Sequence, residues 1–284
     1  MVFHAGLVLE GGGMRGVYTA GVLDYFQEMG ALFETVYGVS AGAVQGCSYL
    51  SGQKGRGYAC AVDYLDDWRY MSPWIFLLTG DLFGVKMCYD TIPNKLYPFD
   101  LEAFQKNPSN LYAVMTDVKT GAPVYRLVKD MDMGLMALRA SASLPLVSRM
   151  VKVDGRKMLD GGIADSIPLE KAMADGYAKN VVVLTQHKEY RKKTSGMGGV
   201  ARIRYPMHKA LRRRMEERHV RYNVQLELVE RMEAEKKAFV IRPKNPVGFA
   251  RIEKDRAKLK ALYIQGYEDG KEVYPRLLDF LGEK

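Results

Sequence analysis

Cysteine, histidine and long apolar runs are scarce in this sequence of 284 residues, which contains 3 Cys and 4 His. The cysteines, Cys47, Cys60 and Cys88, are odd in number and form no CxxC pair, which argues against a disulfide scaffold and against a zinc site. No window approaches the roughly 18 uninterrupted apolar residues of a membrane-spanning helix. The first ten residues lack the basic region and the cleavage site of a signal peptide. We therefore expect a cytoplasmic protein with free thiols.

The overall composition is that of a globular protein, with 48% apolar and 26% charged residues. The apolar fraction is enough for a sizeable core, and it excludes disordered, collagen-like and coiled-coil proteins. Since a domain has roughly 100–200 residues, the chain corresponds to one large domain, alone or with a small appendage.

Positive charge is concentrated in one part of the chain, although the net charge of +9 is modest. Residues 187–260 contain 22 of the 42 Lys and Arg but only 9 of the 33 Asp and Glu. The rest of the chain is slightly acidic. A function for this protein has to account for the strongly basic segment.

The first fifty residues predict two strand–helix units. The expected order is a strand at 6–10, a glycine-rich turn, a helix over 17–29, a strand at 33–37 and a helix over 43–50. This alternation is typical of an α/β protein with a mostly parallel sheet.

Residues 52–104 break this regular pattern. Both tryptophans lie here, and three prolines punctuate the segment, which predicts an insertion or cap of short helices. Its aromatic side chains could form an apolar acyl pocket, or they could simply pack in the core. We expect a catalytic domain over 5–200 that includes this cap, followed by a basic, mainly helical extension over 201–284 packed on the same unit.

Shorter patterns predict the remaining elements of the chain. A hairpin is expected at 111–127 and another at 151–159, with a helix near 131–140 between them and a helix near 166–175 after them. An apolar strand at 181–185 and a polar loop at 188–199 follow. Helices then continue up to Lys237, and a strand at 239–242 precedes a helix to Phe280.

The sequence Gly38-Val-Ser40-Ala-Gly42 is a GxSxG motif between a predicted strand and a predicted helix. Such a turn pushes the serine Oγ out of the fold, and its glycines let the turn close without a Cβ clash. The pattern is short and also occurs in turns whose serine is inert. Its position at a strand-to-helix junction favours Ser40 as a nucleophile.

The first glycine turn, Gly11-Gly12-Gly13-Met14-Arg15-Gly16, also fits the GxGxxG pattern of dinucleotide-binding proteins. That function needs an acidic residue at the end of the second strand, and the serine turn occupies this place instead. Amide groups of a glycine turn at a helix N-terminus suit an oxyanion hole better. Arg15 would add positive charge there, unless it is an ordinary surface arginine.

An activated serine needs a base, and the residues alone leave two candidates. His187 follows the predicted strand 181–185, where a Ser–Asp–His hydrolase could place its base. Asp160 lies in the tight turn Asp160-Gly161-Gly162 after a hairpin strand, although an Asp-Gly turn is common without any catalytic role.

Taken together, the glycine turn, the serine motif and the Asp-Gly-Gly turn resemble those of the patatin-like phospholipase family. The segment Ala140-Ser-Ala-Ser-Leu-Pro145 is also similar to the family's segment before the aspartate, and the resemblance covers residues 5–175. It implies a three-layer α/β/α fold and a Ser40–Asp160 dyad without histidine. It also implies an oxyanion hole from the glycine turn, with Gly12 and Gly13 helped by Arg15.

The resemblance implies a lipid acyl hydrolase that cleaves carboxylic esters through an acyl-serine. A transacylase or thioesterase would use the same dyad, and a non-catalytic lipid-binding regulator is a further alternative. We expect no cofactor, no metal and no nucleic-acid partner. The basic segment 207–231 is expected to contact anionic membrane peripherally, unless its arginines merely pair with neighbouring glutamates on a solvated helix.

Overall fold

A mostly parallel sheet runs through the computed structural model, which describes residues 1–282 apart from 195 and 197. The strand order is β5-β6-β3-β2-β1-β7-β8, and β4 pairs with β3. Strands β3, β2, β1, β7 and β8 are parallel to one another, whereas β4, β5 and β6 pair in antiparallel fashion. The strands are β1 Val2–Leu9, β2 Leu32–Val39, β3 Asn110–Asp117, β4 Pro123–Leu127, β5 Val151–Val153, β6 Arg156–Asp160, β7 Asn180–Val183 and β8 Ala238–Ile241.

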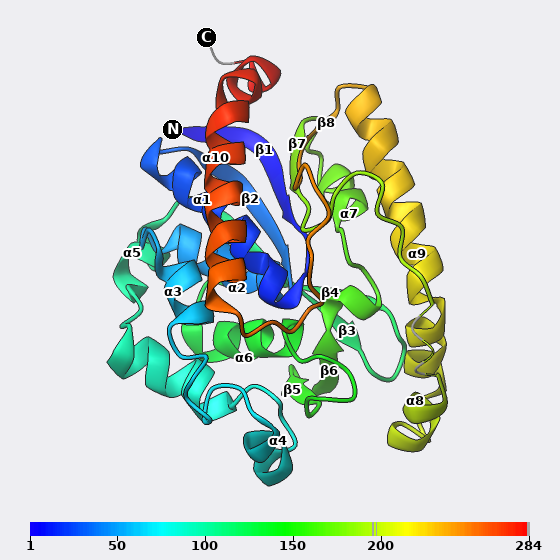
Figure 1. The fold of residues 1–284 in the computed structure, drawn as a ribbon. Helices are drawn as coiled ribbons and strands as arrows, with labels where there is room; N and C mark the ends of the chain where they lie inside the picture. Colours follow the sequence, from blue (N-terminus) through cyan, green and yellow to red (C-terminus); the bar gives the residue numbers. More distant parts are fainter. Residues whose placement is uncertain (195, 197, 283–284) are drawn as a thin grey trace.

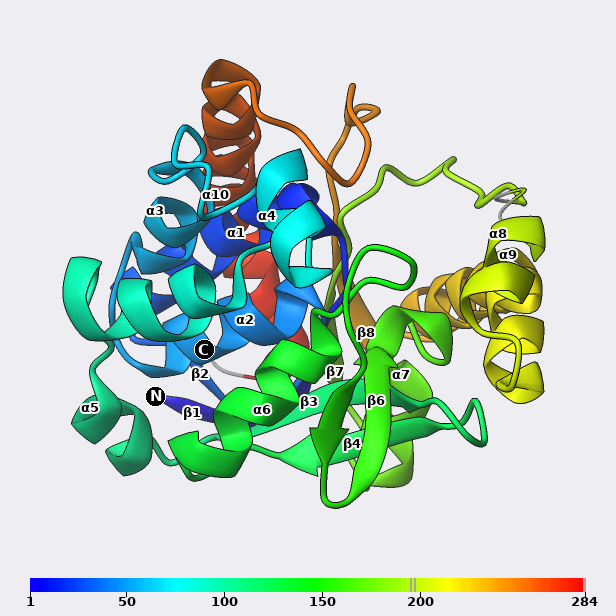
Figure 2. The ribbon, with the colours of Figure 1, turned by 90° about the horizontal axis from the view of Figure 1, so that it is seen from below.

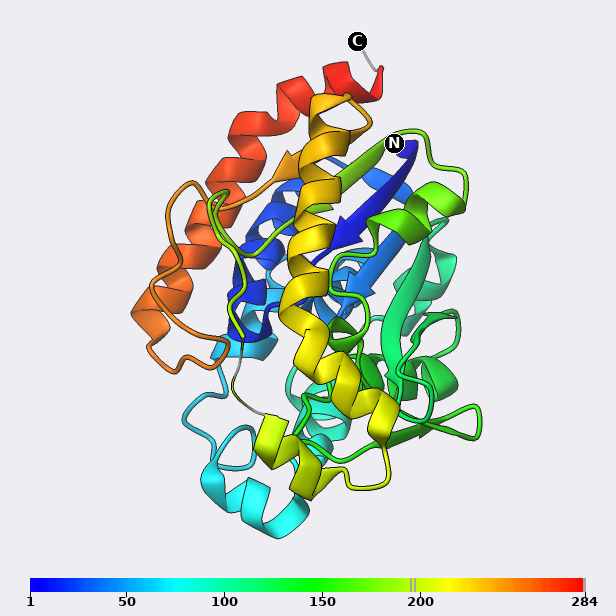
Figure 3. The same ribbon diagram turned by 90° about the vertical axis from the view of Figure 1, so that its right-hand side faces the viewer.

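Helices cover both faces of the sheet, as Figures 1 and 3 show. Side chains alternate between the faces along a strand, so Leu7 and Leu9 of β1 pack toward α1 and α10, while Val8 packs toward α7 and α9. The predicted three-layer α/β/α architecture is confirmed. The helices named so far are α1 Gly16–Glu28, α7 Leu169–Ala174, α9 Lys209–Ala234 and α10 Arg256–Leu281; α2 Ala41–Leu50, α6 Met131–Ser141 and α8 Gly198–Arg204 complete the layers.

Short helices form the segment that was expected to be a cap. They are α3 Arg56–Val62, α4 Pro73–Thr79, a π-helical segment Met87–Leu96 and α5 Leu101–Lys106. Figure 2 shows α3 and α5 on the side of the molecule away from α9, with α4 between them and α9.

The chain between β8 and α10 is irregular, so the helix expected directly after residue 242 was wrong over 243–255. Pro243, Pro246 and Gly248 explain the difference, since proline removes a helical N–H and glycine favours non-helical backbone. Helix α10 begins only after Asp255, whose carboxylate accepts a hydrogen bond from the Ala257 amide at 2.9 Å.

Helices α1 and α10 pack in very close contact, although more than 200 residues separate them. A Cβ added to Gly21 would lie 2.1 Å from the Tyr263 carbonyl oxygen, and one added to Gly266 would lie 2.1 Å from that of Tyr18. The Tyr18 hydroxyl also donates to Asp269 at 2.8 Å. Glycine at both positions therefore permits the contact. None of the helices in the described part of the chain is long and apolar enough to cross a bilayer.

Candidate active site

Ser40 lies at the junction of β2 and α2 with φ of 54° and ψ of −121°, a backbone conformation that non-glycine residues rarely adopt. Both flanking positions require glycine because a side chain would have no room there. A Cβ on Gly38 would lie 2.4 Å from the Ala43 Cα, and one on Gly42 would lie 2.5 Å from the Leu9 carbonyl oxygen. The sharp turn therefore depends on both glycines, and it places Ser40 at the N-terminus of α2.

The pairing of β3 places Ser40 and Asp160 on the same edge of that strand. Val114 pairs with Val39 of β2, and the next residue, Met115, pairs with Asp160 of β6. Strand β4 pairs with both of these β3 residues, so it must occupy the opposite edge. Adjacent positions on a strand are about 3.4 Å apart. The carboxyl ends of β2 and β6 therefore meet end to end, with Ser40 and Asp160 at the junction.

The Asp160 carboxylate is buried, with one oxygen bound and the other unpartnered. Its Oδ1 accepts a hydrogen bond from the Gly162 amide at 2.8 Å, which fixes the side-chain orientation. Its Oδ2 is buried and has no hydrogen-bond partner among the described residues. A Cβ on Gly161 would lie 2.1 Å from the Val114 carbonyl oxygen, so this turn also needs its glycine. The free oxygen is suited to receive a proton.

One short segment at the end of α6 holds both residues, a contact that the sequence did not predict. The Ser40 amide donates to the Ser141 hydroxyl at 2.8 Å, and the Asp160 amide donates to the Ser143 carbonyl at 2.9 Å. Residues 141–143 therefore fix the separation of Ser40 and Asp160. Only the resemblance of 140–145 to a family segment pointed to this part of the chain.

The glycine turn lies directly against Ser40. A Cβ on Gly11 would come within 3.1 Å of the Ser40 Cβ, and one on Gly16 within 2.7 Å of the Ala41 Cβ. The turn continues into a short 3-10 helix, Gly13–Arg15, and among the described residues no acceptor is recorded for the amides of Gly12 and Gly13. These amides are therefore free to hold a developing negative charge next to the serine.

Comparisons with known proteins identify the family of this chain. The family described as patatin-like phospholipase matches residues 7–173, and a domain of unknown function, DUF6363, matches residues 208–282. The chain belongs to the patatin-like phospholipase family.

Several relatives of this patatin-like chain are proteins of bacteria and fungi. It is 31% identical over 183 residues to the uncharacterized protein YjjU of Escherichia coli, covering 63% of this chain and 50% of that protein. It is 29% identical over 165 residues to the uncharacterized NTE family protein Mb1092c of Mycobacterium bovis, covering 57% of this chain and 44% of that protein. It is also 29% identical over 182 residues to the lysophospholipase NTE1 of Eremothecium gossypii, covering 60% of this chain and 11% of that protein. The chain thus spans about half the length, or less, of these relatives.

Arg15 of this patatin-like chain is buried rather than on the surface, and only 6% of it is exposed. Burial lowers the pKa of its guanidinium, partly offset by the carboxylate of Glu10. Glu10 accepts hydrogen bonds from the Thr185 amide at 2.6 Å and from the Tyr222 hydroxyl at 2.7 Å. The charge of Arg15 therefore lies in a polar cluster behind the glycine turn.

A cavity of about 180 Å³ opens beside Ser40. Its walls combine residues of the glycine turn and of α2 with side chains from the predicted cap. The cap contributes apolar and aromatic groups as well as one buried arginine, namely Arg56, Cys60, Ala61, Tyr70, Phe83, Cys88, Tyr89 and Ile92. The Arg56 guanidinium packs over the rings of Tyr97 and Phe99.

His187, the alternative base, does not line the cavity beside Ser40. Its Nδ1 lies 3.0 Å from the carboxylate of Glu189, two residues further along the chain. The end-to-end arrangement of strands therefore favours Asp160 over His187 as the base.

Two arginines of the C-terminal part hold the Asp-Gly-Gly turn and the glycine turn, and the sequence predicted neither contact. The Arg218 Nε of α9 donates to the Gly162 carbonyl. The Arg251 carbonyl accepts a hydrogen bond from the Met14 amide at 2.8 Å. The Asp-Gly-Gly turn and the glycine turn are thus both attached to the region matched by DUF6363.

Proposed function

We propose that the chain is a lipid acyl hydrolase of phospholipase A or esterase type, with Ser40 as nucleophile and Asp160 as base. The observation that carries this proposal is the end-to-end meeting of β2 and β6 on β3. It brings the serine turn and the unpartnered Asp160 Oδ2 to the same place, beside the glycine turn.

In the first half of the reaction, Ser40 is acylated. Asp160 Oδ2 accepts the proton of the Ser40 hydroxyl while Oγ attacks the ester carbonyl carbon. The carbonyl oxygen becomes negatively charged and is held by the amides of Gly12 and Gly13 and by the N-terminal dipole of α2. The C–O bond to the alcohol then breaks, and the departing alkoxide takes the proton from Asp160.

In the second half, water releases the acid. Asp160 takes a proton from a water molecule, whose oxygen attacks the acyl carbonyl of Ser40. The same amides hold the second oxyanion. The ester bond to Oγ breaks, the serine oxygen regains a proton from Asp160, and the carboxylic acid leaves.

The cavity beside Ser40 supports an apolar acyl chain as the part of the substrate that binds there. Its walls include Ala61, Phe83 and Ile92 of the cap. At about 180 Å³ it is smaller than the ~300–1,000 Å³ typical of ligand pockets, which suits one acyl chain rather than two.

Peripheral contact with anionic membrane through the basic segment 207–231 belongs to this proposal. Its support is the exposure of apolar side chains near the start of that segment, with Ile203 85% and Met207 86% exposed. Leu77 of α4 is 76% exposed, and Figures 1 and 3 show α4 and α8 at the same end of the molecule. Exposed apolar residues next to Lys209 and Arg213 are suited to an interface with lipid.

A fluorophosphonate probe combined with a fluorogenic ester tests the dyad. Wild-type protein should be labelled and active, whereas Ser40→Ala should lose both labelling and hydrolysis. Asp160→Asn should lower the rate by about 10²–10⁴, the usual contribution of a general base. His187→Ala is the control and should retain the rate. A large loss in His187→Ala, with Asp160→Asn unaffected, would instead indicate a histidine-dependent triad.

A further inference from the structure

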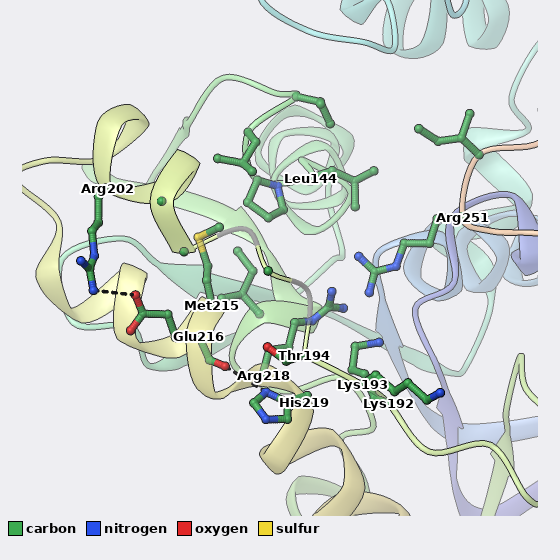
Figure 4. Close-up of a pocket in the computed structure, with 18 of the residues that line it drawn as sticks. Leu144, Lys192, Lys193, Thr194, Arg202, Met215, Glu216, Arg218, His219 and Arg251 are labelled. Carbon is green, nitrogen blue, oxygen red and sulfur yellow. Dashed lines mark hydrogen bonds and ion pairs between the residues drawn. The ribbon is translucent and has the colours of Figure 1, made fainter.

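A second, larger cavity of about 720 Å³ adjoins the one beside Ser40, and Leu144 lines both. Helix α9 forms one wall of the larger cavity, the irregular segment before α10 forms another, and the turn Leu144–Val147 forms a third. Figure 4 shows that Arg218 and Arg251 enter it from opposite sides and point toward each other.

Four cations that line this cavity form no ion pair. Lys192, Lys193, Arg218 and Arg251 have no carboxylate within 4.0 Å in the described part of the chain, and Lys193 is the exposed one among them. The carboxylate of Glu216, which also lines the cavity, faces Arg202 at 3.9 Å. Uncompensated positive charge in a confined space favours binding of an anion.

Burial makes this positive charge costly. It lowers the pKa of Lys192 to about 7, and repulsion from Arg218 and Arg251 adds to the effect. Burial, with repulsion from Arg251, also lowers the pKa of Arg218 to about 10. The carboxylates of Asp160 and Glu10 attract Arg218, and Glu10 also attracts Lys192, but the oxygens of Glu10 are already bound by Thr185 and Tyr222. An anion in the cavity would relieve this repulsion.

The cations are attached to both catalytic turns. Arg218 bonds to the Gly162 carbonyl of the aspartate turn, and the Arg251 backbone bonds to Met14 of the glycine turn. The guanidinium groups can therefore hold part of a substrate whose ester lies at Ser40. Since the smaller cavity is lined mainly by apolar groups and suits the acyl chain, the basic cavity is suited to the alcohol side.

We infer that the basic cavity binds a phosphate group on the alcohol side of the ester, through Lys192, Arg218 and Arg251; this rests on the proposed hydrolase function. Phosphate oxygens accept several hydrogen bonds at once, and arginine presents a planar fork that matches them. The substrate is then an acyl ester of a phosphorylated alcohol, as in a lipid with a phosphate headgroup. A free phosphate ion offers the same chemistry, so the experiment must separate the two.

The experiment compares two soluble esters, dibutanoylglycerol and dibutanoylglycerol 3-phosphate, which differ only in the phosphate. Wild-type protein should prefer the phosphorylated ester. Lys192→Gln and Arg251→Gln should each lower kcat/KM for it by about tenfold or more, mainly through KM, since a hydrogen bond to a charged group is lost. The uncharged ester should be hydrolysed within about twofold of the wild-type rate, which also shows that the variants are folded. Arg251→Gln keeps the backbone carbonyl that binds Met14.

Two variants serve as controls. Lys260→Gln also removes one positive charge, but Lys260 is exposed on α10 and does not line the cavity, so both rates should stay unchanged. Lys192→Arg keeps the charge and should keep the preference. Equal losses on both esters in Lys192→Gln and Arg251→Gln, or no wild-type preference, would overturn the inference.

Inhibition by the product glycerol 3-phosphate and by inorganic phosphate distinguishes a lipid headgroup from a free phosphate ion as the ligand. Glycerol 3-phosphate should inhibit hydrolysis of the phosphorylated ester competitively, as expected of a headgroup site. Inorganic phosphate that binds tightly and changes kcat on both esters, without raising KM, would identify a free-phosphate site and overturn the headgroup inference. A protein that hydrolyses neither ester, yet binds glycerol 3-phosphate less tightly after Lys192→Gln, would contradict the hydrolase function but support the phosphate site.

Discussion

Ser40 has two roles, because it carries the proposed nucleophilic oxygen and also forms the sharp turn between β2 and α2. Its positive φ costs a non-glycine residue about 1–2 kcal/mol, which the surrounding contacts must offset. The hydrogen bond from its amide to Ser141 and the close fit of Gly38 and Gly42 fix this conformation. Strain at this position is therefore tied to the proposed reaction.

Replacing Ser40 by glycine and by alanine should separate strain from chemistry. Both variants should lose hydrolysis and probe labelling, because both lack Oγ. Ser40→Gly should be more stable than Ser40→Ala by about 1 kcal/mol, since only glycine adopts a positive φ without a Cβ clash. Urea unfolding measures the difference. Equal stability of the two variants would show that the turn is not strained.

The pKa of Lys192 predicts how the preference for phosphate esters depends on pH. Its ordinary pKa is 10.5, and burial lowers it to about 7. Lys192 is therefore charged below pH 7 and mostly neutral above pH 8. The groups that face it are Arg15, Arg218 and Arg251, which repel it, Glu10, which attracts it, and the rings of Tyr190 and Tyr222.

We expect KM for a soluble phosphodiester ester, whose charge is constant across this range, to rise as the pH increases from about 6 to 8. Dividing this KM by the KM for an uncharged ester at each pH removes the pH effects that the two esters share. In Lys192→Gln this ratio should be flat with pH. A wild-type ratio that falls or stays constant would contradict the role of Lys192.

The sequence made Ser40 a candidate through its local GxSxG motif, whereas Asp160 was preferred to His187 only through the family resemblance. Lys192, Arg218 and Arg251 had no such signal, because their function depends on contacts between residues far apart in the chain. The bond from Arg218 to Gly162, for example, spans 56 residues. Arg251 was hidden further by the wrong helix prediction, since its backbone reaches Met14 only from an irregular segment.

At the scale of elements, α9 is less uniform than its sequence suggests. Tyr222, Leu226 and Val229 pack toward the sheet, and Arg218 enters the basic cavity. Lys209 and Arg213 remain on the exposed face. The charge pattern alone could not show this division, because Lys and Arg are common both on solvated helices and in binding sites. The membrane proposal therefore concerns only the exposed cations.

The double variant Lys209→Gln and Arg213→Gln tests the membrane contact. Each cation near an anionic surface contributes about 1 kcal/mol, so binding to anionic vesicles should weaken roughly 10- to 30-fold. Sedimentation with vesicles measures the binding, which should also decrease from ~0.05 to ~0.5 M salt. The matched control, Lys260→Gln and Lys271→Gln, removes the same charge from exposed positions on α10 and should bind normally. Equal binding by both double variants would argue against the contact.

At the scale of the whole molecule, the C-terminal part contributes to both the central sheet and a helix layer. Strand β8 extends the sheet beside β7, and α10 covers α1. The patterns of strands and helices predicted the α/β class well, because the periodicity of hydrophobic residues is visible within a short stretch of sequence. The packing of α10 on α1 was not predictable, since it depends on glycines whose partners lie across the chain.

Two glycines of α10 should respond in opposite ways to alanine. Gly266→Ala should destabilise the protein by about 1–3 kcal/mol, because its Cβ would lie 2.1 Å from the Tyr18 carbonyl oxygen. At Gly270, one turn away, the nearest atom would be 3.4 Å from the new Cβ, an ordinary contact. Gly270→Ala should therefore stabilise by up to about 1 kcal/mol through helix propensity. Thermal unfolding of both variants measures this; a loss in Gly270→Ala as large as in Gly266→Ala would contradict the packing argument.

The contact between α1 and α10 has a consequence for biosynthesis. Helix α1 ends at Glu28, whereas α10 begins at Arg256, so the ribosome adds more than 200 residues before the second helix exists. Since translation adds about 5–20 residues per second, the apolar face of α1 stays uncovered by α10 for roughly 10–45 s. Val22 and Phe26 are then available to chaperones or to other nascent chains. The glycine turn also gains its bond to Arg251 only at this late point, so esterase activity should emerge after synthesis of α10 rather than with the catalytic motifs themselves.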